Sequence, residues 1–171
     1  MTRRTARRIS AAAAACAAVA GVSGFAAGSA GASTEPQLCK DAEVRATASP
    51  APDSPSGHHA LVLHYTAADA STHCTVKGAP YGMTFYDGAG APLGVNSSVA
   101  PGGNPADVTI DPAHTATSYV LIPNGPEPGP APAAGLRFHL PSDASNTPVG
   151  VALPNTELTG DPQFTDLVQD S

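Results

Sequence analysis

The sequence predicts an all-β protein, an immunoglobulin-like antiparallel β-sandwich of about seven to nine strands with one disulfide. Short runs rich in strand-forming residues recur between turn-forming residues, at the spacing typical of such sandwiches. After the first 32 residues, the 18 prolines and 13 glycines that follow leave no long stretch with the 3.6-residue period of an amphipathic helix. Two cysteines, Cys39 and Cys74, lie among these runs.

The strands are expected in a regular order along the chain. The strongest run is HALVLHYTA (59–67), which is rich in branched and aromatic residues. Segments 81–87 and 92–98 predict a β-hairpin, because Gly88 and Gly90 can supply the positive φ angles of a tight turn. The predicted strands are 42–48, 59–67, 81–87, 92–98, 106–110, 115–122, 136–140 and 148–153, with a short edge strand near 164–168.

Side chains two positions apart share one face of a strand, and this period sorts the apolar residues into candidate core positions. Leu61, Leu63 and Tyr65 share a face, opposite Val62 and His64. The other shared faces are Met83 with Phe85, and Tyr119 with Leu121 opposite Val120 with Ile122. Because tryptophan is absent, the Cys–Trp–Cys core of a true immunoglobulin domain is missing, and the expected likeness is one of architecture.

The segment PNGPEPGPAPAAG (123–135) is too rich in proline and glycine to form a central strand or a helix. It predicts an exposed, partly extended loop within a single domain that spans residues 33–171. Such loops can dock on aromatic grooves of a partner, and more often they are solvated connections.

The first 32 residues have the order of a secretory signal peptide. Four arginines within the first eight residues precede an apolar run, and an A-x-A cleavage site lies at 30–32. The apolar run is too short, and too rich in alanine and glycine, for a membrane-spanning helix. We therefore expect removal of residues 1–32 and secretion of residues 33–171.

No feature of the sequence predicts a stable membrane anchor. Cys16 lacks the preceding Leu or Val of a lipoprotein signal, and the apolar run continues past it, so a lipid anchor at Cys16 is not expected. The segment LPNTE (153–157) resembles a cell-wall sorting motif with Glu157 in place of the final Gly, but polar and acidic residues follow it. We expect a released, extracellular protein.

Net charge excludes one class of partner. Removal of residues 1–32 takes away four of the eight basic residues and none of the 14 acidic ones, which leaves a net charge of about −10. Such a surface repels phosphate backbones, so no nucleic acid is expected as a partner. It also lacks the basic patch that would bind anionic lipid.

Cys39 and Cys74 are the two cysteines that remain after removal of the signal peptide. In the oxidising environment of an exported protein two cysteines usually pair, although two separate thiols are the alternative. Closure of a loop of about 36 residues would stabilise the fold by about 4 kcal/mol in the chain-entropy model. We predict a Cys39–Cys74 disulfide.

Histidines are numerous, and imidazole is a ligand that suits copper and zinc. The candidate metal ligands are His58, His59, His73 and His114. His59 and His64 are an odd number of positions apart, so they cannot lie on the same face of a strand. No H-E-x-x-H or C-x-x-C motif is present. We expect no bound metal or other cofactor, and keep a histidine-based copper or zinc site as the alternative. The six histidines are His58, His59, His64, His73, His114 and His139.

Catalytic motifs are absent from the sequence. A hydrolase needs a nucleophile, a base and an oxyanion hole, and no G-x-S-x-G motif supplies the first. The acidic residues lie mostly beside Pro or Gly in predicted turns and do not pair. We therefore expect no enzyme activity, and rank hydrolysis last among the hypotheses.

Three segments together resemble a known family. GHHALVLHYT (57–66), CTVKGAPYGMTFYDGAGAPLG (74–94) and VTIDPAHTATSYVLI (108–122) are similar in order and spacing to the family called domain of unknown function 4232. The likeness spans most of the chain from Cys39 to about Leu153. The sequence departs from the family pattern at 67–68, where two alanines stand in place of a frequent Asn, and at Ala113, where Gly is frequent.

The resemblance implies a β-sandwich exported to the envelope or medium, as is common for this family in actinobacteria. It implies no reaction, because a fold alone does not define a function. The leading hypothesis is a secreted, non-catalytic module that binds a protein or a cell-wall polymer.

Overall fold

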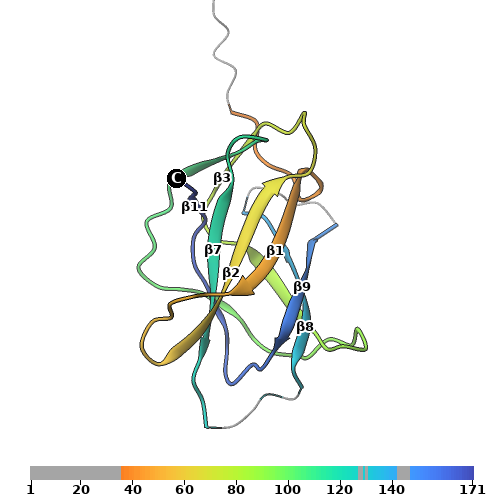
Figure 1. The fold of residues 1–171 in the computed structure, drawn as a ribbon, viewed down its shortest axis with the longest axis vertical. Helices are drawn as coiled ribbons and strands as arrows, with labels where there is room; N and C mark the ends of the chain where they lie inside the picture. The colour runs from red at the N-terminus through yellow and green to blue at the C-terminus, as the bar shows by residue number, and fades with distance from the viewer. Residues whose placement is uncertain (1–35, 127–128, 130, 142–146) are drawn as a thin grey trace, which may run out of the picture. The chain divides into compact units, whose positions relative to one another are not determined.

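A computed structural model describes residues 36–126, 129, 131–141 and 147–171, and Figure 1 shows its fold. The predicted signal peptide, with Cys16, lies outside these residues, as does part of the predicted Pro-rich loop. The described chain forms a short 3-10 helix η1 (Asp41–Glu43) and the following strands: β1 (Val44–Pro50), β2 (His58–Ala67), β3 (Cys74–Lys77), β4 (Tyr81–Tyr86), β5 (Ser98–Val99), β6 (Asp107–Ile110), β7 (Ala116–Pro123), β8 (Ala133–His139), β9 (Val149–Thr156), β10 (Gln163–Phe164) and β11 (Val168–Gln169).

The all-β prediction is confirmed, and the strands of the described residues pair mainly in the antiparallel sense. One sheet has the order β1-β2-β7-β10-β5, and β11 also pairs with β7. A second sheet has the order β4-β8-β9, and β3 pairs with β6 in a separate ladder. Among these strand pairs only β5 and β10 run parallel. The immunoglobulin-like assignment itself stays a prediction.

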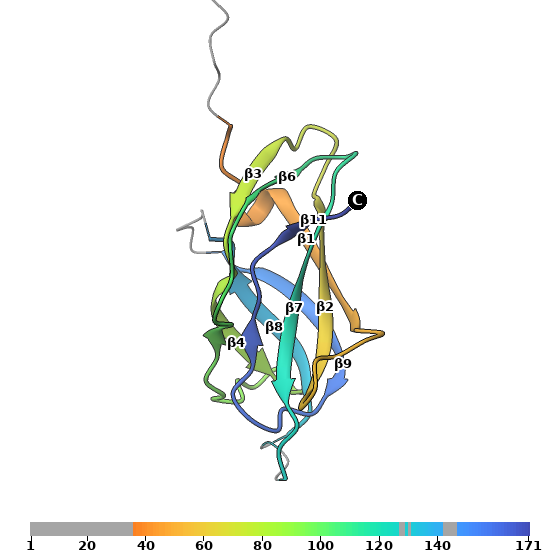
Figure 2. The ribbon, with the colours of Figure 1, turned by 90° about the vertical axis from the view of Figure 1, so that its left-hand side faces the viewer.

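The two larger sheets pack face to face, and Figure 2 shows β2 and β7 in one layer with β4 and β8 in the other. In β2, Leu61, Leu63 and Tyr65 point into the core as the alternation predicts. Phe138 of β8 approaches from the opposite sheet, and its ring meets the Tyr65 ring edge-on with centroids 5.9 Å apart. Such aromatic pairs add stabilisation beyond the burial of apolar area.

The alternation in β7 resolves which of its two faces is buried. Val120 and Ile122 are fully buried, together with Ser118 on the same face. Tyr119 and Leu121 therefore point out of the core, and 37% of Tyr119 is exposed. The period was readable in the sequence, but both faces of this strand are apolar, so the sequence did not distinguish inside from outside.

The prediction that 92–98 forms a hairpin strand is wrong, although its turn is present. Gly90 has a φ of 81° and closes the turn after β4. Leu93 then donates one hydrogen bond back to β4. The ladder ends there because Pro92 has no N–H to donate and Gly94 adopts a left-handed φ of 64°. The strand that pairs with β4 over its length is β8 instead.

Cys74 begins strand β3, which is absent from the strands predicted from the sequence. The turn after β2 ends earlier, because the Asp69 carboxylate accepts hydrogen bonds from the backbone N–H and the hydroxyl of Ser71. Residues 74–77 are then free to pair with β6.

Two predicted boundaries also shift. The segment 123–135 is a loop only in part, because β7 continues through Pro123 and β8 begins at Ala133. The predicted edge strand near 164–168 is two short strands, β10 and β11, which both lie beside β7.

Candidate functional site

The Cys39–Cys74 disulfide is present and fastens the chain before η1 to strand β3. The backbone around it forms a further connection, because the Cys39 N–H bonds to the Thr75 carbonyl and the Thr75 N–H bonds to the Gln37 carbonyl. Both half-cystines are almost fully buried. The crosslink is therefore part of the core, with a structural role rather than that of a reactive thiol pair.

Asp41 lies two residues after the crosslink and joins η1 to the end of β8. Its side chain is fully buried, and one carboxylate oxygen accepts the Leu140 N–H at 2.8 Å. The other lies 2.5 Å from Nδ1 of His139, whose ring packs against the Tyr81 ring. The sequence did not single out His139, yet it is the histidine with the most buried partner.

The His139–Asp41 pair resembles part of a catalytic triad, but among the described residues no nucleophile completes it. Within the part of the chain that the structure describes, no histidine ring is hydrogen-bonded to a serine, threonine or cysteine side chain. A base without a nucleophile in reach does not define acyl-transfer chemistry. The pair is accounted for by its structural contacts.

Asp111 brings two of the four metal-site candidates together at the end of β6. One oxygen accepts the N–H groups of Ala113 and His114 at 2.7 and 2.8 Å, and also faces Nδ1 of His114 at 2.9 Å. Nδ1 of His73 lies 3.5 Å from the other oxygen. The His114 hydrogen bond, followed by that of the Ala113 N–H, holds the pKa of Asp111 below its usual value.

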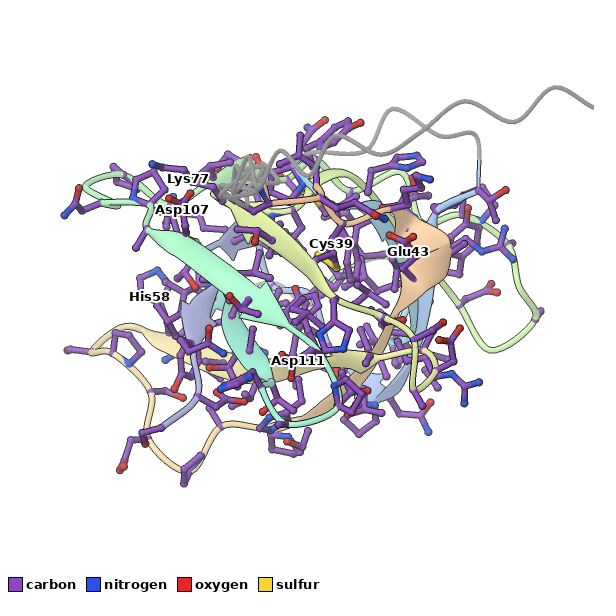
Figure 3. The ribbon with its side chains drawn as sticks, turned by 90° about the horizontal axis from the view of Figure 1, so that it is seen from above. Cys39, Glu43, His58, Lys77, Asp107 and Asp111 are labelled. Carbon is purple, nitrogen blue, oxygen red and sulfur yellow. A yellow bond between two sulfur atoms is a disulfide. The ribbon has the colours of Figure 1, made fainter. Side chains whose placement is uncertain are left out.

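The other two candidates lie at the opposite end of the domain's main sheet, and Figure 3 shows His58 well apart from Asp111. His59 faces Asn124 through Nδ1 at 3.2 Å and the Glu157 carbonyl through Nε2 at 3.1 Å, so both of its ring nitrogens are occupied. Among the described residues, no group of three or more His, Cys, Asp or Glu side chains is arranged to hold a metal ion.

Surface hollows offer a different kind of site. Four hollows on the described surface have similar volumes, between about 400 and 460 Å³, so size does not separate them. The hollow lined by β6, by Tyr119 of β7, by residues 165–167 and by β11 has a mainly apolar lining, which favours ligand binding. We call it the Tyr119 groove. It is lined by Gly103, Asn104, Ala106, Asp107, Val108, Tyr119, Thr165, Asp166, Leu167, Val168 and Gln169.

The groove exists because the pairing beside β7 is interrupted. Thr165 pairs with Tyr119, since its N–H bonds to the Tyr119 carbonyl and its hydroxyl accepts the Tyr119 N–H. Val168 pairs with Thr117. Residues 166 and 167 therefore stand opposite Ser118, the single residue of β7 between Thr117 and Tyr119, which is the pattern of a β-bulge. Leu167 turns inward and donates its N–H to the Gly78 carbonyl. Tyr119, beside this bulge, is partly exposed.

A second hollow lies on the other side of the same tyrosine. It is lined by residues 53–55 of the loop before β2, together with Tyr119, Leu121 and Thr165. Tyr119 therefore stands between two hollows, and Val168 in the first of them is 52% exposed. The sequence held one signal of this arrangement, an aromatic residue on the strand face opposite to Val120 and Ile122.

Asp166, which lines the groove, has a carboxylate oxygen without a hydrogen-bond partner in the described part of the chain. Its Oδ2 atom is buried and has no hydrogen-bond partner among the described residues. Gly103 packs directly against this oxygen, leaving no room for a side chain at position 103. Because Gly103 covers this oxygen, a ligand in the groove would respond to the negative charge of Asp166 and would not bond to the buried oxygen itself.

Comparison with known proteins identifies the family. The family model described as Domain of unknown function (DUF4232) matches residues 39–167, most of the chain, so the protein belongs to this family. No curated protein and no solved structure gives a match. In the described part of the chain, no helix has the length and apolar character needed to cross a bilayer.

Proposed function

We propose that this domain is a secreted, non-catalytic binding module, and that the Tyr119 groove takes an extended, positively charged polypeptide segment. The observation that carries the proposal is the exposed Tyr119 ring between two hollows. Tyrosine is enriched at protein interfaces because it offers a large, rigid contact area at a low cost in conformational entropy.

The apolar part of the groove supports a polypeptide as the occupant. Val168 lines the groove together with Tyr119 and is more than half exposed. Its backbone is held in place by strand pairing with β7, the strand that contains Tyr119. Large apolar side chains that gather in a polar-rimmed hollow of a soluble domain are typical of interaction sites.

The charges around the groove support a cationic occupant. Asp107 and Asp166 both line it, and the net charge of residues 33–171 is about −10. A lysine or arginine at the groove could pair with Asp166 and lie over the Tyr119 ring, where cation–π attraction adds to the charge term. The same field would speed the association of a positively charged partner.

The disulfide supports an oxidising, extracellular location for the module, since such crosslinks are rare in reducing compartments. It also gives the binding surface a stable frame outside the cell. The signal peptide expected at 1–32 would deliver the chain there.

The proposal is tested by selecting short peptides from a displayed random library against the purified, oxidised protein. Selected peptides should be rich in lysine, arginine and apolar residues, and Tyr119→Ala should weaken their binding by about tenfold or more. Tyr81→Ala is the matched control, because Tyr81 is also an exposed tyrosine, 42% exposed, but lies on β4 in the other sheet.

Two results would count against a polypeptide ligand. If binders are obtained but Tyr119→Ala and Tyr81→Ala affect them equally, the groove is not the binding site. If the protein instead sediments with purified peptidoglycan in a manner that Tyr119→Ala abolishes, the occupant is a wall polymer.

A further inference from the structure

Strand β6 has an edge that opens into the Tyr119 groove. On its other edge β6 pairs with β3, and Thr75 stands opposite Thr109 in that ladder. The N–H and carbonyl of Thr75 bond to residues 37–39, away from β6. Thr75 and Thr109 are therefore a pair without mutual hydrogen bonds, and the backbone groups of Thr109 also point away from β3.

The same alternation fixes the direction of the Asp107 backbone. Lys77 and Asp107 lie two positions along the ladder from Thr75 and Thr109, so they too form a pair without mutual backbone hydrogen bonds. The Asp107 N–H and carbonyl then point away from β3, on the side where Asp107 lines the groove. Within the described residues no backbone hydrogen bond reaches them from that side.

Gln169 shows that this edge accepts amide partners. Its side-chain carbonyl accepts the Thr109 N–H at 2.9 Å, and its side-chain NH₂ donates to the Thr109 carbonyl at 3.1 Å. The same NH₂ donates to the Thr115 carbonyl. One side-chain amide thus makes the two bonds that the backbone of a neighbouring strand would make at Thr109. At Asp107 nothing in the described chain takes that role.

Charge defines the side chains that such a neighbouring strand would carry. The Asp107 carboxylate is 72% exposed and lies 3.7 Å from the Lys77 ammonium, and Figure 3 shows the two side by side. An exposed pair of this kind is weak, so a second cation can share the carboxylate. Asp166 also lines the groove and adds a second negative charge there.

From these observations we infer that the occupant of the Tyr119 groove binds by β-strand addition. An extended segment pairs its backbone with the Asp107 edge of β6 and directs alternate lysine or arginine side chains toward Asp107 and Asp166. Its remaining side chains face Tyr119 and Val168. This inference rests on the proposed function and specifies its binding mode, in which backbone hydrogen bonds contribute affinity and alternate side chains contribute specificity.

The first test uses a capped peptide of alternating valine and lysine as the probe, measured by calorimetry against the purified, oxidised protein. Two isomers of the peptide carry N-methyl groups, one on its valines and the other on its lysines. Only one set of N–H groups faces β6, so one isomer should bind about tenfold more weakly than the parent and the other should match it. Equal binding of all three peptides would overturn strand addition.

The second test alters the edge of the protein. Asp107→Pro removes the outward N–H without touching a β3–β6 hydrogen bond, and should weaken binding about tenfold. Asp107→Ala, the matched control, keeps the N–H and should weaken binding only about twofold. Gln169→Ala frees both backbone groups of Thr109 and should tighten binding about fivefold, whereas a ligand that merely rests on Gln169 would bind more weakly.

These outcomes separate the two proposals. Loss of binding in Tyr119→Ala, with no effect of Asp107→Pro or of N-methylation, would keep the groove as the site and dismiss strand addition. Binding of the probe that is insensitive to Tyr119→Ala, or no binding of the probe at all, would overturn both. Circular dichroism and thermal unfolding of each variant show whether the domain is folded, and tightening in Gln169→Ala cannot result from unfolding.

Discussion

Asp41 and Asp111 make the same kinds of hydrogen bond in two regions of the domain, but the two aspartates have different structural roles. Each carboxylate accepts a backbone N–H and faces Nδ1 of a histidine. The partners of Asp41 lie 98 and 99 residues away along the chain, and its side chain is fully buried. The hydrogen-bond partners of Asp111 lie two and three residues away, and the His114 side chain is 58% exposed. A further contact of Asp111, at 3.5 Å, is with the exposed His73.

The difference shows that the role of a carboxylate contact depends on how far apart its partners lie in the sequence. Bonds from Asp41 join η1 to the end of β8 and so hold distant parts of the chain together. The hydrogen bonds of Asp111 shape the turn between β6 and β7, and its longer contact with His73 reaches the segment before β3. Because loop closure has an entropic cost that grows with loop length, the long-range contacts of Asp41 depend more on the rest of the fold than the local hydrogen bonds of Asp111 do.

Removal of the crosslink next to Asp41 should have the largest effect. Replacing both Cys39 and Cys74 by serine enlarges the conformational freedom of the unfolded chain, and the two sites are 35 residues apart. We expect a loss of about 4 kcal/mol in the free energy of unfolding, measured by urea denaturation of the oxidised protein.

Dithiothreitol provides the control for that comparison. It should lower the stability of the wild type toward that of the double serine variant and leave the variant unchanged. If the wild type retains its midpoint after complete reduction, the crosslink does not hold the Asp41 region in place.

Asp41→Ala should have the next largest effect. It leaves the buried Leu140 N–H without an acceptor and removes the partner of His139, which should cost about 3 kcal/mol of unfolding free energy. Asp41→Asn, which keeps one carbonyl acceptor, should cost less. Chemical denaturation measures both, and a loss in Asp41→Ala no larger than in Asp111→Ala would erase the contrast between the two aspartates.

A neutral buried pair sharpens the comparison. The Tyr65 hydroxyl and the Ser118 hydroxyl are hydrogen-bonded at 2.8 Å between β2 and β7, and burial raises the pKa of Tyr65. Tyr65→Phe should cost about 1 kcal/mol at neutral pH, because it leaves the Ser118 hydroxyl without its partner.

The raised pKa of Tyr65 adds a pH dependence to this prediction. The neutral phenol is favoured in the folded state, so stability falls as pH rises above the usual value of 10.0. Raising the pH should therefore lower the thermal stability of the wild type more than that of Tyr65→Phe, as measured by thermal unfolding. Adding Ser118→Ala should restore most of the stability lost at neutral pH, and a further loss in the double variant would contradict this account.

Asp111→Asn should have the smallest effect and a distinct pH profile. The pKa of Asp111 is lowered below its usual value of 3.8, chiefly by the His114 hydrogen bond. The ionised Asp111 carboxylate therefore stabilises the folded state above pH 3.8, and this stabilisation is lost as the pH falls through the lower pKa of the folded state. Thermal unfolding between neutral pH and strongly acidic pH should show a smaller acid-induced loss in Asp111→Asn than in the wild type. Parallel curves for the two proteins would contradict the prediction.

Much of the fold was predictable, because strand periodicity and turn chemistry act over a few residues. The core face of 59–67 followed from alternation alone, and the disulfide followed from the cysteine count. The strand at 92–98 was not excluded, because the left-handed conformation of Gly94 is fixed by the folded backbone around it. Short strands such as β10 and β11 carry too few residues to show a period.

The candidate site was less predictable, for physical reasons visible in particular residues. The apolar character of Tyr119 suggested burial, and only the sheet order places that face of β7 outside. The Asp166 environment depends on Gly103, which is distant in sequence. Likewise His139 was passed over as a candidate because its partner, Asp41, lies near the other end of the domain.

The position of β7 has a consequence for assembly of the domain during synthesis. One edge of β7 pairs with β2, and its other edge is covered by β10 and β11 from the C-terminal part of the chain. In Figure 1 the dark blue β11 lies beside β7. A growing chain therefore presents an unpaired edge of a central strand until residues 163–169 have been made. Protection against edge-to-edge aggregation is acquired only when these residues dock.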